Sequence, residues 1–322
     1  MASRPPPSAA EGSMTTISAK IIADSVSQAG IRLTSLQLRY PRFIHAELMT
    51  HRAFSRNASS SRAIPVSRLI DDMRRDPAMP IHWGKNQKGM QADEECNERV
   101  NLGPSMGLAH EFLASSSEAW IHAMNQAIAV AEAFDAAGFH KQVVNRLLEP
   151  FSHINVLVTA TDFANFFALR LHKDAEPHIR ILAGEMKAAM DTSIPTELHP
   201  GEWHLPYVTK EDWAQFPPDL IEGGDGYSYD EALENLMKVS VARCARLSYL
   251  TYEGKRSWLS DDIALYEKLV VAEPMHASPA EHQATPDTYS QEYQDWDTPS
   301  QHGNLRGWRQ HRKMLANEAV PG

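Results

Sequence analysis

Cysteine is scarce in this sequence of 322 residues, which contains only Cys96 and Cys244. Neither belongs to a C-x-x-C pair, so a cysteine-based zinc site or a disulfide scaffold is not expected. So few cysteines suit a reducing compartment, and we expect a cytoplasmic protein. Neither residue has neighbours typical of an activated thiolate, and Cys244 falls on an apolar helix face, so thiolate catalysis is not expected either.

Long apolar runs and a surplus of positive charge are also absent. No run of about 18 apolar residues occurs, so we expect no membrane span. The formal net charge is -10 at pH 7, whereas a protein that binds a nucleic-acid polymer needs an excess of Lys and Arg. A local arginine cluster can still bind a small anion. Residues 1–15 are rich in Pro, Ser and Ala without an apolar signal segment, so we expect a disordered tail.

Gly-rich nucleotide motifs are missing as well. Neither G-x-G-x-x-G nor a P-loop occurs, so a Rossmann dehydrogenase or a kinase has no support. Apolar periodicity predicts mostly helices and at least two strands, one of them at 31–40, while residues 156–161 are expected to form a strand or the entry to a helix. The expected class is therefore α+β, with a single domain over 16–322 and an irregular, Pro- and Trp-rich insertion at about 195–227.

Helices are predicted wherever apolar residues recur with helical spacing. Pro41 opens the first, Gly138 ends the longest, and Ser67, Ser228 and Ser260 are candidate N-caps. Residues 53–65 are too rich in Ser and Asn for a helix and predict an ordered loop. The predicted helices cover 42–52, Ser67 to Asp76, 105–137, 140–149, 163–172, 176–191, 229–247, 261–272 and 306–318.

A first polar cluster spans residues 50–62 and reads THRAFSRNASSSR. It holds three arginines and several hydroxyls in one short segment. Arginine offers planar, charge-assisted donors and serine offers short neutral ones, which suits a phosphate or pyrophosphate. A solvated basic loop is the structural alternative, because charge runs usually lie on the surface.

This segment resembles the signature R-H-R-x-x-S-x-N-x-x-S-x-R of the flavin-dependent thymidylate synthases. Six of its seven fixed positions match, and Thr50 replaces the first Arg. The resemblance implies that the first half binds FAD and the second half binds the nucleotide. The matching residues are His51, Arg52, Ser55, Asn57, Ser60 and Arg62.

Roles follow from the resemblance residue by residue. His51, Arg52 and Asn57 are implied to bind FAD, whereas Ser60, Ser61 and Arg62 are implied to bind the nucleotide at its phosphate. Glu47 stands where the family has a Gln that helps to bind the nucleotide. An acid beside a phosphate is unfavourable unless it is protonated or turned away.

A second cluster begins with Arg146-Leu147-Leu148-Glu149-Pro150, which resembles the family's R-x-x-L-P element, whose Arg contacts the nucleotide phosphate. Residues 159–175 resemble the helix that ends in an Arg bound to the uracil ring, and Asn165 and Arg170 match it, which implies an FAD contact from Asn165 and a uracil contact from Arg170. Thr159 and Thr161 replace residues that usually touch the flavin, and Glu176 replaces a usual Gln.

Arg170 is implied to be catalytic together with Ser60. An Arg at the pyrimidine edge stabilises the negative charge that grows as C5 becomes nucleophilic, an effect of roughly 3 kcal/mol. A surface arginine on an amphipathic helix is the alternative for Arg170.

A third cluster comprises residues 243–249 and 276–282. They resemble the family elements R-x-A-R-x-S and H-E-T-P-x-E-H, which implies FAD contacts from Ser248, His276, Ser278 and Glu281. The alternatives are a helix-terminal arginine pair and a His-rich loop. Zinc at His276 and His282 is disfavoured because no third ligand lies close in sequence.

The order of the clusters differs from the usual one, because the family has the third cluster first. A circular permutation explains this order, since joining old termini and opening a new connection preserves a packed site. The stretch at 195–227 would then lie at or near the new join.

The resemblance implies reductive methylation of dUMP to dTMP with FAD, 5,10-methylenetetrahydrofolate and NADPH, in a homotetramer with sites at subunit boundaries. The cofactor carries the chemistry while the protein supplies placement and charge. Two alternatives stay open. One is methylation or hydroxymethylation of another pyrimidine nucleotide, motivated by Glu47, Thr159, Thr161 and Glu176. The other is an inactive homologue that binds flavin or nucleotide.

Overall fold

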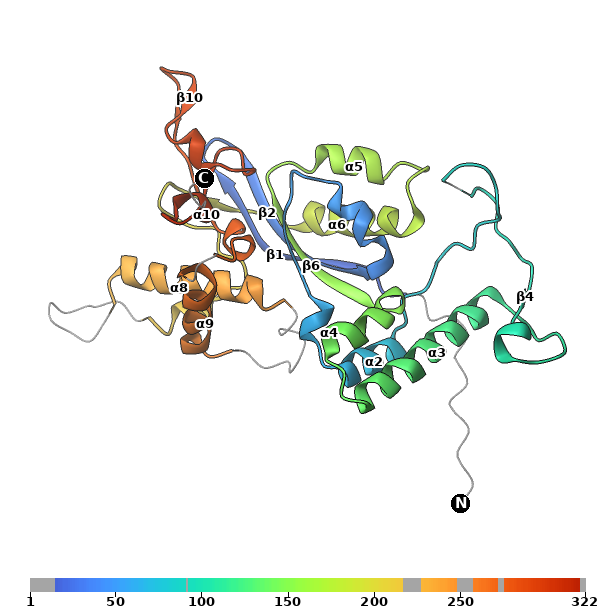
Figure 1. Cartoon of the computed structure of the whole chain (residues 1–322). Coiled ribbons are helices and arrows are strands. Elements are labelled where there is room, and N and C mark those ends of the chain that lie inside the picture. Colours follow the sequence, from blue (N-terminus) through green and yellow to red (C-terminus); the bar gives the residue numbers. More distant parts are fainter. Residues whose placement is uncertain (1–14, 91, 217–226, 248–256, 272–274, 319–322) are drawn as a thin grey trace.

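The computed structural model describes residues 15–90, 92–216, 227–247, 257–271 and 275–318 (Figure 1). The predicted tail at 1–15 therefore lies almost entirely outside the described residues. Among the helices that are described, none has both the length and the apolar composition needed to cross a bilayer.

A five-stranded sheet forms the centre of the molecule, in the order β3-β6-β2-β1-β7. Neighbouring strands are antiparallel except for β7, which runs parallel to β1. This arrangement confirms the α+β class and the mostly antiparallel sheet. The strands are β1 (Ser18–Ser27), β2 (Arg32–Pro41), β3 (Ser55–Ala58), β6 (His153–Ala160) and β7 (Thr196–Leu198).

Apolar side chains on both faces of β2 and β6 explain why these strands lie in the middle. Leu36 and Leu38 of β2 pack with Val156 and Val158 of β6 in one core. Leu157 faces the opposite side, where it packs against helix α8. A strand that is apolar on both faces needs cover on both sides, and the sheet is accordingly sandwiched between two groups of helices.

The first face is covered by α1, α5 and α6 (Figure 1). Burial of apolar side chains drives this packing, since Ile179, Leu182 and Met186 of α6 are fully buried. The helices are α1 (His45–Met49), which follows the 3-10 turn η1 (Arg42–Ile44), α5 (Ala164–Arg170) and α6 (Pro177–Thr192).

A separate core lies beyond one end of the sheet, where Leu69 and Met73 pack against Met124 and Ile128. Three short 3-10 turns connect this helical group to β3 and β6. Its members are α2 (Val66–Arg75), α3 (Ser116–Ala136), α4 (Lys141–Val144) and the turns η2 (Ser61–Ala63), η4 (Asn145–Leu147) and η5 (Glu149–Phe151).

The second face carries the C-terminal part of the chain. Helices α8 and α9 lie on the side of the sheet away from α5 and α6 (Figure 1), and η7 packs against β3. The elements are α7 (Lys210–Trp213), α8 (Tyr229–Ala245), α9 (Leu259–Tyr266) with its π-helical end η6 (Glu267–Val271), η7 (Ser278–Glu281), β8 (Ala284–Pro286), β11 (Trp308–Gln310) and α10 (His311–Met314).

Small elements complete the surface. Two short hairpin-like pairs and two 3-10 turns lie in the connections, where backbone polar groups reach water. They are β4 (Val100–Asn101) with β5 (Leu113–Ala114), β9 (Tyr289–Ser290) with β10 (Asp295–Trp296), η3 (Pro104–Met106) and η8 (Pro299–Gln301).

Several sequence predictions are confirmed. The strand at 31–40 and the helices at 163–172, 176–191 and 229–247 all occur, with ends shifted by a few residues. Ser228 caps α8 in a capping box, and Gly138 ends the α3 region with a φ of 82°. A positive φ favours glycine there because it has no Cβ.

Other predictions are wrong where tertiary contacts compete with local pattern. The loop at 53–65 contains β3, because residues 55–58 pair with β6. The helix at 105–137 begins only at Ser116, where Ser115 and Glu118 form a capping box. The helix at 306–318 is instead β11 and the short α10, because residues 308–310 pair with β8.

The remaining differences concern helix ends and one insertion. Residues 195–216, the part of the predicted irregular region 195–227 that is described apart from Tyr227, contain β7 and α7. The helix at 140–149 breaks into α4 and two 3-10 turns. Pro65 and Trp258 occupy the N-cap positions predicted for Ser67 and Ser260.

A buried polar chain crosses the second face of the sheet. His204 bridges Ser25 (2.9 Å from Nδ1) and Ser35 (2.8 Å from Nε2). Ser35 contacts Thr159 at 2.6 Å, and Thr159 contacts His282 Nδ1 at 2.8 Å. Burial lowers the pKa of both histidines to about 3, because a charged imidazole loses its hydration there.

We expect acid to destabilise the fold through these histidines. The unfolded chain binds their protons below about pH 6.5 whereas the folded chain does not, so the free energy of unfolding falls as pH decreases toward 3. Each such proton contributes about 1.4 kcal/mol per pH unit in that window. Urea denaturation at a series of pH values should show a shallower fall for His204→Gln. The exposed His172→Gln serves as control; equal slopes for both variants and wild type would refute this origin.

Candidate functional site

A hollow of about 220 Å³ lies between the segment after α1 and helix α5. Its lining comes from the first and second sequence clusters, which the sheet brings together because β3 pairs with β6 just before α5. The lining residues are Thr50, His51, Arg52, Ala53, Phe54, Asp162, Asn165, Phe166, Leu169 and Arg170.

Arg170 is held at one edge of its guanidinium. Its Nε donates to His51 Nε2 at 2.8 Å, and its Nη2 donates to Thr50 Oγ1 at 3.1 Å and to the Glu47 carbonyl at 3.4 Å. Nη1 makes no hydrogen bond within the part of the chain that the structure describes. The planar group is therefore oriented on one side and retains donors for a ligand on the other.

His51 forms part of the floor of the hollow. It is buried, with the ring of Phe166 edge-on at 4.8 Å and the ring of Phe54 at 6.0 Å. Burial lowers the His51 pKa, and the charges of Arg170 and Arg56 lower it further. The imidazole is therefore neutral at pH 7, with Nε2 accepting from Arg170 and the proton on Nδ1.

The rim of the hollow is polar and open. Arg52 and Asn165, both expected to bind FAD, are exposed there. Thr50, which replaces the Arg of the signature, donates to the Glu47 carbonyl at 2.7 Å besides accepting from Arg170. Glu47 itself is half-buried, and its Oε2 is buried without a hydrogen-bond partner among the described residues.

A second group lies after β3, where η2, η4 and η5 meet. Ser61 Oγ donates to Glu149 Oε1 at 2.6 Å, and Arg146 Nη1 lies 3.0 Å and 3.2 Å from the two Glu149 oxygens. Half-buried Ser60 precedes η2. Arg62 is exposed and makes no hydrogen bond or ion pair with any residue that the structure describes.

A third group lies beside β3 and joins the first and third sequence clusters. Ser278 Oγ donates to Asn57 Oδ1 at 3.3 Å, and Asn57 Nδ2 donates to the Cys244 carbonyl. His276 is exposed nearby in the chain, and the Glu281 carboxylate accepts from Arg312. Ser248, also expected to bind FAD, lies outside the described residues.

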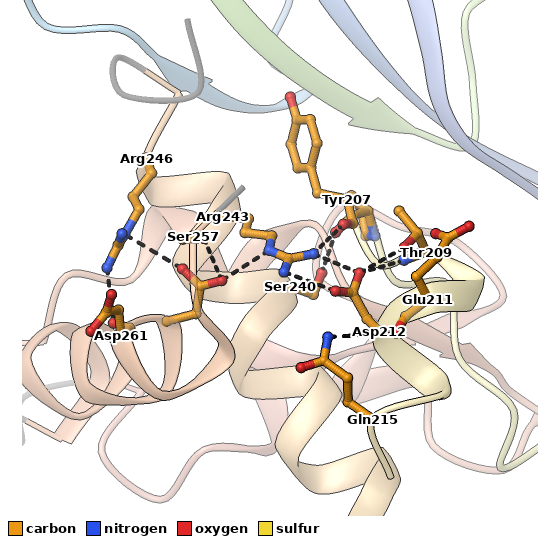
Figure 2. A network of polar contacts seen from close by, with 12 residues as sticks. Tyr207, Thr209, Glu211, Asp212, Gln215, Ser240, Arg243, Arg246, Ser257 and Asp261 are labelled. Atoms are coloured by element: carbon orange, nitrogen blue, oxygen red, sulfur yellow. Dashed lines mark hydrogen bonds and ion pairs between the residues drawn. The ribbon is translucent and has the colours of Figure 1, made fainter. Parts of the chain in front are cut away.

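The two arginines of the third cluster have structural partners (Figure 2). Arg243 donates to both carboxylate oxygens of Asp212, at 2.7 and 3.0 Å, and to Asp262 at 2.9 Å. Arg246 donates to the Asp261 carbonyl at 2.8 Å. The structural alternative of a helix-terminal arginine pair is thus correct for these residues, which tie α7, α8 and α9 together.

Two residues that differ from the family's usual ones, Glu176 and Thr159, have structural roles. Glu176 caps α6, since its side chain accepts from the Ile179 N–H at 3.0 Å. Thr159 is fully buried in the polar chain that ends at His282. Neither side chain lines the hollow.

Two arginines expected at opposite ends of the nucleotide, Arg62 at the phosphate and Arg170 at the pyrimidine, lie on either side of β3 in the chain. Arg170 contacts residues before β3, whereas Arg62 follows β3. A strand of this length spans roughly 13 Å at its usual rise per residue. One chain therefore does not bring Arg62 and Arg170 into contact.

Sequence reasoning missed Asn145 and the bridging position of Glu149. Fully buried Asn145 donates to the carbonyls of Ser61 (2.7 Å) and Ile64 (2.9 Å), which fixes η2. The available signal was a polar residue inside an otherwise apolar helical pattern. The C-terminal segment was also underestimated, because Gln310 and Asn304 contact Ser55 at 3.3 and 3.1 Å.

Thiolate chemistry and metal binding find no support here. Cys244 is fully buried, and burial raises its thiol pKa well above the ordinary range. Cys96 lies in the connection at 81–104 and lines a different hollow. The described residues contain no group of His, Cys, Asp and Glu side chains arranged to hold a metal ion.

An α+β chain that gathers arginine, histidine and asparagine around an open hollow is equipped to bind an anionic small molecule. The family model described as "Thymidylate synthase complementing protein" matches residues 33–196, just over half of the chain. The protein belongs to this family. The match covers the first and second clusters and ends before the third.

Solved structures add a distant similarity. Two crystal structures of the UMP/dUMP methylase PolB from Streptomyces cacaoi, bound with 5-Br dUMP and with 5-Br UMP, are each 15% identical to this chain, with a TM-score of 0.39. They cover 55% of this chain and 90% or 89% of the PolB chain. No curated protein matches the sequence.

Arg243→Met should destabilise the fold by about 3–5 kcal/mol, because Asp212 would stay buried without its counter-ion and Asp262 would keep only the longer pair with Arg246, at 3.6 Å. Both carboxylates are fully buried, and hydrogen bonds from Arg243 hold the pKa of Asp212 low despite burial. Denaturant titration measures the change. Arg74→Met, which breaks the exposed pair with Glu132, should cost less than about 1 kcal/mol. Equal losses in the two variants would contradict a buried-charge origin.

Proposed function

We propose that this protein is an FAD-dependent thymidylate synthase that methylates dUMP to dTMP with 5,10-methylenetetrahydrofolate and NADPH. Family membership supports the reaction class. The observation that carries the proposal is the arrangement of Arg170 on His51 beside exposed Arg52 and Asn165, around one hollow. These are the residues in which the family signatures match.

FAD fits the chemistry of this hollow. Arg52 supplies charge-assisted donors for a pyrophosphate, Asn165 supplies an amide, and His51 with Phe54 and Phe166 supplies a neutral, largely apolar wall. On the side of β3, Asn57 and Ser278 offer further polar groups, and we propose that His276, Glu281 and Ser248 join them. When bound, FAD supplies the hydride chemistry, with NADPH as reductant and the folate as carbon donor.

The hollow in one chain is smaller than a complete site. Ligand pockets usually enclose about 300–1,000 Å³, against about 220 Å³ here. We therefore propose that each site is completed by another copy of the chain, in a homotetramer. The residues proposed to bind the nucleotide phosphate, Ser61 and Arg146, would then face Arg170 of another copy.

An exposed apolar surface is available for such assembly. The α3–α4 region presents large apolar side chains to solvent, and Leu147 among them adjoins Arg146. Contiguous exposed apolar surface marks protein–protein contact more often than chance. The side chains are those of Val130, Phe134, Phe139, Val143 and Leu147, which are 36–52% exposed.

Arg170 has the clearest role in the proposed reaction. With Nε and Nη2 tied to His51, Thr50 and Glu47, its Nη1 donors can meet the carbonyl edge of the pyrimidine. A preoriented cation there stabilises the charge that develops as C5 attacks. Neutral His51 supports this orientation without adding a second charge. Ser60, Ser61, Arg62 and Arg146 would hold the nucleotide phosphate.

A second candidate is the same chemistry on a cytosine nucleotide. Glu47, in place of the family's Gln, has a buried oxygen without a partner among the described residues. A carboxylate accepts hydrogen bonds only, and cytosine presents an amino donor at N4 where uracil presents an acceptor. This observation favours dCMP as the competing substrate, with a methyl or hydroxymethyl product.

Incubation of the purified protein with FAD, NADPH, 5,10-methylenetetrahydrofolate and either dUMP or dCMP tests the proposal. We expect yellow protein that releases FAD on heating, and dUMP that gains one methyl group by mass spectrometry. Conversion of dCMP alone would replace dUMP by the second candidate. Protein that stays colourless after reconstitution with FAD would contradict both reactions.

Arg170→Lys should lower kcat for dUMP methylation by about 100-fold or more, because lysine cannot hold the fork that orients its charge. FAD content, read from visible absorbance per protein, should stay unchanged. The control is Arg180→Lys, at an exposed position of α6, which should leave kcat as in wild type. Loss of FAD together with activity would show that Arg170 maintains the flavin segment rather than the reaction.

A further inference from the structure

The group of polar side chains where η2, η4 and η5 meet, here called the anion cradle, already holds a negative charge, the carboxylate of Glu149. Glu149 accepts from buried Ser61 at 2.6 Å and from Arg146 at 3.0 and 3.2 Å. These two donors are the residues assigned above to the nucleotide phosphate. A carboxylate with two oxygens on a hydroxyl and a guanidinium makes the same contacts that a phosphate would make.

The side chains around Glu149 carry more positive charge than its single carboxylate neutralises. Arg42 lies close by, because its backbone N–H donates to the carbonyl of Ser152, three residues after Glu149, at 2.9 Å. Burial lowers the Arg42 pKa, and the charge of Glu149 partly offsets this by raising it. The Arg42 Nε is buried without a partner among the described residues. Arg62 follows Ser61 directly and is exposed. Arg146 pairs with this carboxylate and the charge of Arg42 acts on it as well, so two arginines face one negative charge and the cradle is net positive.

Glu149 is placed to leave this cradle. Its side chain is 24% exposed and that of Arg146 is 60% exposed, so rotation about side-chain bonds moves both toward solvent. Ser61 stays in place, because Asn145 holds its carbonyl at 2.7 Å. Two anions cannot share the same donors, since like charges at contact distance repel.

We propose that Glu149 is a built-in competitor for the 5′-phosphate of the nucleotide: it occupies Ser61 and Arg146 in the empty site and turns away when the phosphate binds. The nature of the phosphate rests on the proposed function, whereas the competition depends only on the cradle. Glu149 stands at the Leu of the R-x-x-L-P pattern, so the device is a feature of this chain. The Glu149 carboxylate lowers the affinity of the cradle for phosphate and keeps Ser61 and Arg146 in place when no ligand is bound.

Glu149→Gln tests the competition because it keeps the size of the side chain and removes its charge. Isothermal titration should show tighter binding of dUMP by about five- to tenfold, and of inorganic phosphate in the same direction. Deoxyuridine, which lacks the phosphate, should bind as it does to wild type. Glu149→Asp keeps the charge but is too short to bridge Ser61 and Arg146, and should give an intermediate gain.

Glu132→Gln is the matched control, since Glu132 is an exposed glutamate paired with Arg74. An equal gain in this variant would attribute the effect to net charge and overturn the proposal. Unchanged or weaker phosphate binding by both Glu149 variants, or an equal gain for deoxyuridine, would overturn it as well. If Glu149→Gln binds inorganic phosphate more tightly while no nucleotide is methylated, the competition stands and the proposed reaction fails.

Discussion

The pairing of β3 with β6 is the interaction on which the rest of the site depends. Ser55–Ala58 adds only four residues to the edge of the sheet, in register with Val156–Thr159. The hollow lies before this strand, the anion cradle follows it, and the third cluster packs along its outer side. An unpaired strand edge needs protection, and here η7, Gln310 and Asn304 cover it while bringing Ser278 to Asn57.

The arginines of this acidic chain differ in how many of their N–H donors remain available to a ligand after pairing within the fold. Arg243 is buried and donates to two buried carboxylates and to the Tyr207 carbonyl, so it stabilises the packing of α7, α8 and α9 and is not presented to a ligand. Arg170 is held along one edge only. Arg62 is exposed. Burial and pairing, rather than residue type, separate structural arginines from those that can bind a ligand.

Three glutamates stand where the family pattern has an uncharged residue, and the structure gives each a different consequence. Glu176 caps a helix, where a carboxylate is favourable because it accepts from free N–H groups. Glu149 accepts from Ser61 and Arg146, the donors that we propose for the nucleotide phosphate. Glu47 keeps one oxygen buried without a partner among the described residues. The effect of an acidic residue at such a position thus depends on its local partners: a helix end, a pair of donors, or none among the described residues.

The sequence by itself determined the α+β class, the central strand at 31–40, the helices at 176–191 and 229–247, and the residues that meet at the hollow. The class, the strand and the helices depend on local periodicity, which a short segment already contains, whereas the residues at the hollow were implied by the resemblance of short motifs to the family. Only the tertiary structure decided that 55–58 and 308–310 are strands, because each gains its hydrogen bonds from a partner far along the chain. It also decided that Glu149 lies on Ser61, 88 residues away. Such pairings depend on how the whole chain packs, which no local pattern records.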